Sequence, residues 1–260
     1  MAKAIAVCNQ KGGVGKTTTA VNLAACLAAA EHRTLLVDMD PQSNATTGVG
    51  IDKHDLDLST YDVITERKRK GVQIQISDIV KRSTLIQYLD VAPASPDLAG
   101  AEIELVNHMT REKKLAQALD RARGQYEYVI IDAPPSLGLL TINTLACADS
   151  VLIPIQCEYY ALEGLAELLN TIRLVQKNLN PRLIIMGALL TMYDGRLNLC
   201  RQVAEDVKAC FSGKVFQTAI VRNVKLSEAP SFGKPIILYD IMSAGAENYL
   251  NLAKEIMHDE

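Results

Sequence analysis

Short apolar runs alternate along the chain with longer amphipathic stretches. The runs span 3–8, 34–40, 88–94, 126–134, 150–155 and 183–191. They are almost continuously apolar, which indicates strands of a sheet that is covered on both faces. The amphipathic stretches are 16–32, 102–125, 161–180, 197–211 and the closing 247–260. This alternation predicts an α/β fold with a doubly wound, mostly parallel sheet.

In the stretches between these runs, apolar residues recur at helical spacing, so we expect the stretches to be amphipathic helices. Within 102–125, the spacing places Ile103, Leu105, Val106 and Met109 on one buried face of a long helix. In doubly wound folds, ligands bind at the carboxyl ends of the strands. Candidate chemistry is therefore expected directly after each apolar run.

Composition narrows the class of protein. The chain has 260 residues, and no Pro-, Gly- or Ser-rich linker interrupts it, so we expect one domain over 1–260. The formal net charge is -3, so any nucleic-acid binding must come from a local basic patch. Six cysteines without a CxxC pair indicate buried reduced thiols. With no signal pattern and no run long enough for a bilayer, we expect a soluble cytoplasmic protein.

The stretch NQKGGVGKTTT follows the first apolar run and opens the first helical stretch. It is a variant phosphate loop, because Gln10 stands where the standard pattern has its first glycine. Glycines let backbone N–H groups surround phosphate oxygens, Lys16 can reach the β- and γ-phosphates, and the Thr17 hydroxyl can ligate Mg²⁺. The nucleotide-binding set is Lys11, Gly12, Gly13, Val14, Gly15, Lys16, Thr17 and Thr18.

Acidic residues end two other apolar runs. Asp38 and Asp40 close the run 34–40, where a carboxylate would face the phosphates, although an Asp-Pro turn could also simply end the strand. Asp132 ends the run in YVIIDAPPS, the pattern of a carboxylate bonded to magnesium waters. The APPS segment that follows predicts a switch that responds to the γ-phosphate.

The loop KGGVGKTT resembles the deviant Walker A motif of the ParA/MinD family of ATPases. Further segments, among them DPQSNATTGVGI, IIDAPPSLGLLTINTLACAD, PIQCEYYALEGL and RNVKLSEAPSFGKPIILYD, resemble chromosomal-type ParA, also called Soj. The resemblance implies an Mg²⁺-dependent ATPase whose two subunits enclose two ATP molecules. It also implies that Lys11 crosses the dimer interface to the partner's nucleotide.

The resemblance assigns further roles. Asp40 would orient or activate the attacking water, Asp38 would serve the outer shell of the magnesium, and the catalytic set would be Lys11, Lys16, Asp40 and Asp132. Thr17, Asp38 and Asp132 would form the metal site. The loop at 220–223 would cover the adenine, with Val221 and Asn223 as contacts, although many relatives have proline at the position of Val221.

A basic island lies in residues 196–225, where six Lys or Arg stand against two acids, giving a local charge of +4. By resemblance, Arg196 and Lys225 match the DNA-binding face of Soj, and Arg201 and Lys214 are weaker candidates. The only aromatic residues interleaved there are Phe211 and Phe216, too few for a base-stacking platform, so the contacts should go to phosphates without sequence preference. The basic run at 66–71 is interpreted as a solvated loop rather than a DNA contact.

Other branches of the family carry sequence features that this chain lacks. Residues 136–146 lack the cysteine of a nitrogenase-type reductase, and no CxxC follows Cys210. The C-terminal stretch carries Glu255, Asp259 and Glu260, which is unlike a basic membrane-binding helix. The first strand begins by residue 3, which leaves no room for an N-terminal helix-turn-helix. The expected form is the short, Soj-like one, without membrane binding.

The resemblance implies a cycle for this form. An ATP-bound homodimer grips non-specific DNA on the nucleoid, and a ParB-like partner stimulates its slow hydrolysis, which releases the DNA. Two alternatives remain: a related ATPase that positions another cargo, such as a chemotaxis cluster, a carboxysome or a cellulose synthase, and a MinD-like membrane-positioning ATPase.

Overall fold

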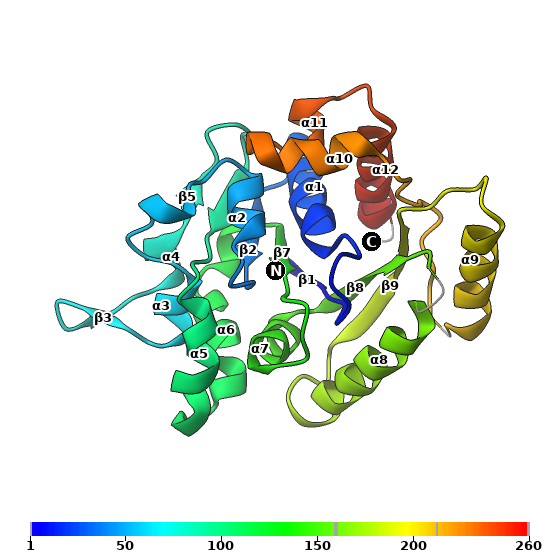
Figure 1. The fold of residues 1–260 in the computed structure, drawn as a ribbon. Helices are drawn as coiled ribbons and strands as arrows, with labels where there is room; N and C mark the ends of the chain where they lie inside the picture. Colours follow the sequence, from blue (N-terminus) through cyan, green and yellow to red (C-terminus); the bar gives the residue numbers. More distant parts are fainter. Residues whose placement is uncertain (1, 159–160, 212, 259–260) are drawn as a thin grey trace.

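The computed structural model of the chain describes residues 2–158, 161–211 and 213–258. One large sheet has the order β5-β6-β2-β7-β1-β8-β9 (Figure 1). Its strands are β1 (Lys3–Val7), β2 (Thr34–Asp38), β5 (Lys81–Arg82), β6 (Leu89–Ala92), β7 (Tyr128–Asp132), β8 (Ser150–Gln156) and β9 (Ile184–Thr191). All pairs are parallel except β5–β6. The mostly parallel sheet confirms the fold class expected from the sequence.

Helices cover both faces of this sheet. The helices are α1 (Lys16–Ala29), α2 (Asn44–Gly48), α3 (Thr60–Ile64), α4 (Ile76–Ile79), α5 (Leu98–Glu104), α6 (Lys114–Leu119), α7 (Leu139–Cys147), α8 (Ala161–Asn178), α9 (Asn198–Cys210), α10 (Val224–Glu228), α11 (Ile236–Tyr239) and α12 (Ala244–His258). In Figure 1, α1, α10, α11 and α12 lie on one side of the sheet, and α5 to α8 lie on the other.

Successive residues of the central strands face opposite layers, which explains their continuous apolar character. Ile130 of β7 packs in a cluster with the apolar residues of α1, whereas Val129 and Ile131 pack in a cluster that includes Leu140 of α7. All three β7 residues are fully buried. Burial of one such side chain contributes about 1.5–3 kcal/mol, so the two apolar layers stabilise the sheet on both faces. The pairing of β7 with β1 and β2 sets which strand ends lie side by side.

The prediction of one long helix over 102–125 is wrong. The segment folds as the end of α5, the 3-10 helices η2 (Leu105–Asn107) and η3 (Arg111–Lys113), then α6 and a third 3-10 helix, η4 (Arg123–Gln125). The α-helix ends at Glu104, the backbone is extended at His108, and Thr110 takes a φ of 55°, in the left-handed region. Of the residues expected on one buried face, Leu105 is buried, but Ile103, Val106 and Met109 are exposed.

The basic run at 66–71 forms part of a β-hairpin instead of an irregular loop. Strands β3 (Lys68–Arg69) and β4 (Val72–Gln73) pair antiparallel, and the turn residues Lys70 and Gly71 both have positive φ. Two successive positive φ values define the tight turn that suits a hairpin. The expectation that these side chains are solvated holds, because Lys68, Arg69 and Lys70 are exposed.

The predictions for the cysteines and for the acidic C-terminal tip concern some residues that the structure does not describe. Cys8, Cys26, Cys147, Cys157 and Cys200 are buried free thiols, as predicted, and the side chain of Cys210 lies outside the described part. The acidic tip at 259–260 also lies outside it. Among the described residues, none of the helices is both long enough and apolar enough to cross a bilayer.

Candidate functional site

The phosphate loop connects β1 to the start of α1, as the sequence predicts. Gly13 and Gly15 have φ values of 75° and 86°, in the region where side chains other than glycine are strained. A Cβ on Gly13 would meet no atom within 4 Å, so the backbone there is open to a ligand. Gly15 is the N-cap of α1, and no side chain caps this end. The free N–H groups of the first turn therefore favour an anion.

Lys16 lies inside the loop that it would use. Its side chain is buried, and its Nζ donates a hydrogen bond of 2.9 Å to the carbonyl oxygen of Lys11. Burial lowers the pKa of Lys16, whereas the nearby Asp132, Cys8 and Asp40 oppose this shift. The ammonium group is thus positioned at the centre of the loop before any nucleotide binds.

Lys11 lies at the outer rim of the loop. Its Nζ forms an ion pair of 3.2 Å with Oε2 of Glu158, and the two side chains are 35% and 48% exposed. Glu158 also accepts a 2.5 Å hydrogen bond from Nε2 of Gln156. Lys11 therefore points away from the centre of the loop, where the ammonium group of Lys16 lies. This arrangement is compatible with a lysine that does not bind the nucleotide of its own subunit.

The carboxyl ends of β1, β2 and β7 bring the predicted acids together. Asp38 and Asp132 are directly paired in the β2–β7 ladder, and Val7 pairs with Asp132 in the β1–β7 ladder. The two aspartates are fully buried, and Asp40 is 6% exposed. The structure therefore gathers three carboxyl groups behind the phosphate loop.

Asp38 and Asp40 hold the turn that follows β2. Oδ2 of Asp38 accepts hydrogen bonds of 2.8 and 2.7 Å from the N–H and hydroxyl of Thr46, and its Oδ1 accepts a 3.0 Å bond from the N–H of Asp40. Oδ1 of Asp40 accepts a 2.9 Å bond from the N–H of Gln42. Burial raises the pKa of Asp38 to about 6, although the Thr46 bonds act against this. Asp38 thus anchors α2, and its magnesium role stays a prediction.

Asp132 differs from Asp38 because neither of its carboxylate oxygens has a hydrogen-bond partner among the described residues. Its pKa is raised, first by burial and then by repulsion from Asp38 and Asp40, while Thr17 and Lys16 lower it. An unpartnered buried carboxylate is costly, so this position fits a bound cation or its water shell.

A magnesium ion would fit this position in the manner typical of nucleotide enzymes. Among the described residues, no group of three or more His, Cys, Asp or Glu side chains could hold a metal by itself. Magnesium keeps several waters and usually binds through one or two side chains together with phosphate oxygens. Thr17 and Asp132 are the residues that would hold it here.

Removing the charge of Asp132 should stabilise the nucleotide-free protein. Because its pKa is raised on folding, ionisation of Asp132 costs stability as the pH rises above its unfolded value of about 4. We expect Asp132→Asn to raise the free energy of unfolding by on the order of 1–3 kcal/mol at pH 8. The gain should shrink towards acidic pH. Urea unfolding at several pH values measures it, with exposed Asp57→Asn as the control. A less stable variant at pH 8 would contradict this account.

The two predicted adenine contacts line a cavity of about 210 Å³ with residues of the phosphate loop. Val221 and Asn223 meet Gly15 and Thr18 there. The other lining residues were not predicted from the sequence. They are Thr191, Met192, Ile220, Arg222, Leu226, Ser227, Pro230 and Tyr249. Thr191 and Met192 stand at the carboxyl end of β9, so the rule that led to the aspartates could have found them.

The predicted DNA contacts lie on two adjacent segments. The N–H of Tyr193 donates to the carbonyl of Ile220, and the N–H of Arg222 donates to the carbonyl of Tyr193, at 3.0 and 3.1 Å. These bonds place the segment before Arg196 beside the one before Lys225, at the edge of the cavity lined by Val221 and Asn223. The structure therefore joins the candidate DNA segments to the nucleotide site.

Each candidate DNA contact already has a partner in the chain. Arg196 is 89% exposed and forms an ion pair of 2.7 Å with Asp194. Lys225 pairs with Glu228 at 3.0 Å, and Lys214 pairs with Glu255 at 3.4 Å. Arg201 donates a hydrogen bond to Asn198. The pair of Lys225 and Glu228 is exposed on both sides, and such pairs contribute little, so a phosphate can compete for Lys225. The acids that pair with Arg196 and Lys214 are each 16% exposed.

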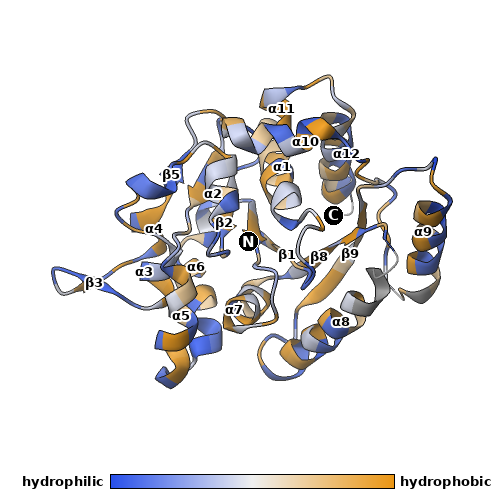
Figure 2. Cartoon of the chain, in the orientation of Figure 1, coloured by the Kyte–Doolittle hydropathy of each residue, from blue (hydrophilic) through white to orange (hydrophobic). Residues whose placement is uncertain are grey.

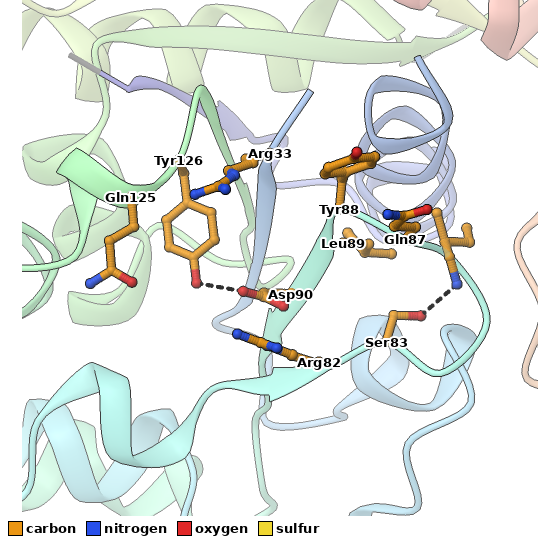
Figure 3. A pocket seen from close by; sticks show the side chains of 10 residues that line it. Arg33, Arg82, Ser83, Gln87, Tyr88, Leu89, Asp90, Gln125 and Tyr126 are labelled. Carbon is orange, nitrogen blue, oxygen red and sulfur yellow. Dashed lines mark hydrogen bonds between the residues drawn. The ribbon is translucent and has the colours of Figure 1, made fainter. Parts of the chain in front are cut away.

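A second cavity lies far from this site. It measures about 380 Å³ and includes Arg33, Arg82, Asp90 and Tyr126 (Figure 3). The Tyr126 hydroxyl donates a 2.9 Å hydrogen bond to Asp90. Arg33 directly precedes β2, so this cavity lies at the opposite edge of the sheet from the phosphate loop. None of the predicted site residues lines it.

Known proteins are similar to this chain over most of its length. A protein-family model described as an AAA domain matches residues 2–185. The sporulation initiation inhibitor protein Soj of Bacillus subtilis is 60% identical over 256 residues, covering 98% of both chains. The chromosome partitioning protein ParA of Myxococcus xanthus is 56% identical, over 97% of this chain and 87% of that protein.

A solved structure is also similar to this chain. It is that of a protein named cobyrinic acid a,c-diamide synthase from Mycobacterium smegmatis, with a bound ATP analogue and magnesium. It is 36% identical to this chain, with a TM-score of 0.85, and the alignment covers 99% of this chain and 95% of that one.

The fold and the loop define a phosphate-loop ATPase. Within that class, the chain belongs to the Soj/ParA family of chromosome-partitioning proteins. This confirms the resemblance that the sequence motifs indicated. The roles of individual residues remain predictions from geometry and resemblance.

Proposed function

We propose that this chain acts over its whole length as a DNA-segregation ATPase in the cytoplasm, on the nucleoid. ATP and Mg²⁺ bind at the phosphate loop, and two ATP-bound subunits close on each other. The observation that carries the proposal is the placement of the two lysines. Lys16 is buried at the centre of the loop, whereas Lys11 lies at its rim and is turned towards Glu158.

Lys16 and the N–H groups at the start of α1 bind the phosphates of the subunit's own nucleotide. Magnesium, when bound, neutralises charge on the β- and γ-phosphates, and Thr17 and Asp132 are placed to hold it. Val221 and Asn223 orient the adenine, because they line the cavity beside Gly15. Asp40 orients the attacking water from the turn that follows β2.

Lys11 leaves Glu158 and reaches the nucleotide of the partner subunit when the dimer closes. The ion pair to be broken is about half exposed, and such pairs contribute only about 0–1 kcal/mol. A phosphate group carries more charge than one carboxylate, so the exchange favours the closed dimer. The same closure brings together two copies of the segments that carry Arg196 and Lys225, which couples DNA binding to ATP.

A ParB-like partner completes the proposed cycle. It binds the closed dimer and accelerates a slow intrinsic hydrolysis, after which the dimer opens and the DNA is released. This step rests on the family, since ParA and Soj relatives align with the chain over nearly its full length. The proposal includes no membrane binding.

Replacing Lys11 tests the proposed closure. We expect Lys11→Ala to bind ATP with nearly unchanged affinity, because the residue serves the partner's nucleotide, but to lose the ATP-dependent dimer and the DNA binding that requires it. Calorimetry measures the first property, and light scattering and DNA-binding assays measure the other two.

Glu158→Gln is the matched control for Lys11→Ala. It breaks the same ion pair but keeps the lysine, so it should dimerise at least as readily as the native chain. If Lys11→Ala still forms an ATP-dependent dimer, the proposed contact across the interface does not exist. If both variants fail alike, the ion pair itself supports closure.

A further inference from the structure

The hairpin formed by β3 and β4 projects from one edge of the molecule and carries a concentrated positive charge (Figure 1). Residues 67–73 include four basic side chains and no acidic one, whereas the whole chain has a net charge of -3. Figure 2 shows the projecting segment as hydrophilic. A projecting strand pair with one sign of charge is an interaction surface for an anionic partner.

One of the four cations belongs to the base of the hairpin. Arg67 pairs with the buried Asp62 at 3.0 Å, and its guanidinium lies 5.5 Å from the centroid of the Tyr61 ring. The N–H of Ile74 donates a 2.9 Å hydrogen bond to the carbonyl of Arg67, and Ile74 is buried. The hairpin is therefore fixed to the body of the protein at its base.

The other three cations are available to a partner. Lys68, Arg69 and Lys70 are exposed, and none of them pairs with a carboxylate within the part of the chain that the structure describes. Asp78 lines the groove beside the hairpin, but among the described residues it forms no ion pair with these three cations. The charge of the hairpin is thus largely uncompensated.

We propose that the hairpin of residues 67–73 is a second, nucleotide-independent contact with duplex DNA. Successive residues of a strand point to opposite faces, so Lys68 and Arg69 place charge on both sides of the strand pair, with Lys70 at its tip. The major groove, about 12 Å wide, admits a two-stranded β-ribbon, and phosphates line both of its walls. A flat anionic surface would meet only one face of this hairpin.

This contact requires neither ATP nor a second subunit, because one chain contains the complete hairpin. It goes beyond the proposed function, in which DNA binding depends on closure of the dimer. Three phosphate contacts give only weak, salt-sensitive binding, which does not replace the contacts that the closed dimer makes. The hairpin reads no sequence, since its free side chains are cations suited to phosphates.

The test measures binding of the nucleotide-free protein to a short duplex by fluorescence anisotropy as a function of salt. The variant combines Lys68→Gln, Arg69→Gln and Lys70→Gln. We expect at least a tenfold loss of affinity at low salt, and a slope of log affinity against log salt that is shallower by roughly 2–3. The matched control removes three exposed cations elsewhere, through Arg173→Gln, Lys177→Gln and Lys254→Gln.

A measurement with ATP separates the hairpin from the contacts that need the closed dimer. With ATP, the hairpin variant should keep the ATP-dependent gain in affinity. An unchanged affinity and slope in the hairpin variant, or an equal loss in the control, would overturn the proposal. Stronger hairpin-dependent binding to anionic phospholipid vesicles than to DNA would overturn it too.

Discussion

Lys16→Ala should lose tight binding of ATP. The ammonium group of Lys16 is buried in the loop, where a charge-assisted bond to a phosphate is stronger than in water. Hydrogen bonds to charged groups contribute about 1.5–3 kcal/mol each, so we expect the affinity to fall by at least 10- to 100-fold. Isothermal calorimetry with Mg²⁺ and a slowly hydrolysed ATP analogue measures the change.

The control for Lys16→Ala is the other lysine of the same loop. Lys11→Ala removes an equal charge a few residues away and should leave the affinity of the single subunit nearly unchanged. Thermal unfolding checks that both variants remain folded. An affinity of Lys16→Ala within about twofold of the native value would remove Lys16 from the phosphate site, since even one weak bond contributes more.

Asp40→Ala should bind ATP and close into a dimer, but hydrolyse ATP slowly. Loss of a side chain that orients or activates water commonly costs 10²–10⁴ in rate, roughly as for other general bases. The closed dimer should then remain on DNA. Single-turnover hydrolysis and dissociation from DNA after ATP removal measure the two effects.

Asp40→Asn distinguishes chemistry from structure at this position. The asparagine oxygen can still accept the 2.9 Å hydrogen bond from the N–H of Gln42, but it lacks the negative charge. If Asp40 acts on water, the asparagine variant should be as slow as the alanine variant. Native hydrolysis by Asp40→Asn would show that the residue merely holds the turn.

The sequence predicted the central strands and the phosphate site because both depend on local patterns. β7 is buried on both faces, and its continuous apolar run required no knowledge of its neighbours. Gly13 and Gly15 are glycines because their backbone has positive φ. The parallel arrangement then brought Asp38 and Asp132 together, as the rule for carboxyl ends of strands predicts.

Other features depend on contacts that the sequence does not display. The segment 102–125 has helical spacing, but the α-helix ends at Glu104 and the backbone is extended at His108, and Ile103 and Met109 are exposed. The cavity of about 210 Å³ combines residues from the phosphate loop, β9 and α12, and the resemblance predicted Val221 and Asn223 as adenine contacts but not the residues of β9 and α12. The ion pair of Lys11 with Glu158 joins residues 147 positions apart, which no local pattern indicates.

The hydrogen bonds between Asp38 and Thr46 affect the entropy of nucleotide binding. Thr46 is buried, and its hydroxyl also accepts a 3.0 Å bond from the N–H of Ala94, so the turn after β2 is tied at both ends without any ligand. Fixing the backbone of one residue costs about 1–2 kcal/mol, and here that cost is met when the chain folds. In the proposed cycle, ATP would meet an ordered turn, and more of its binding free energy would remain for drawing two subunits together.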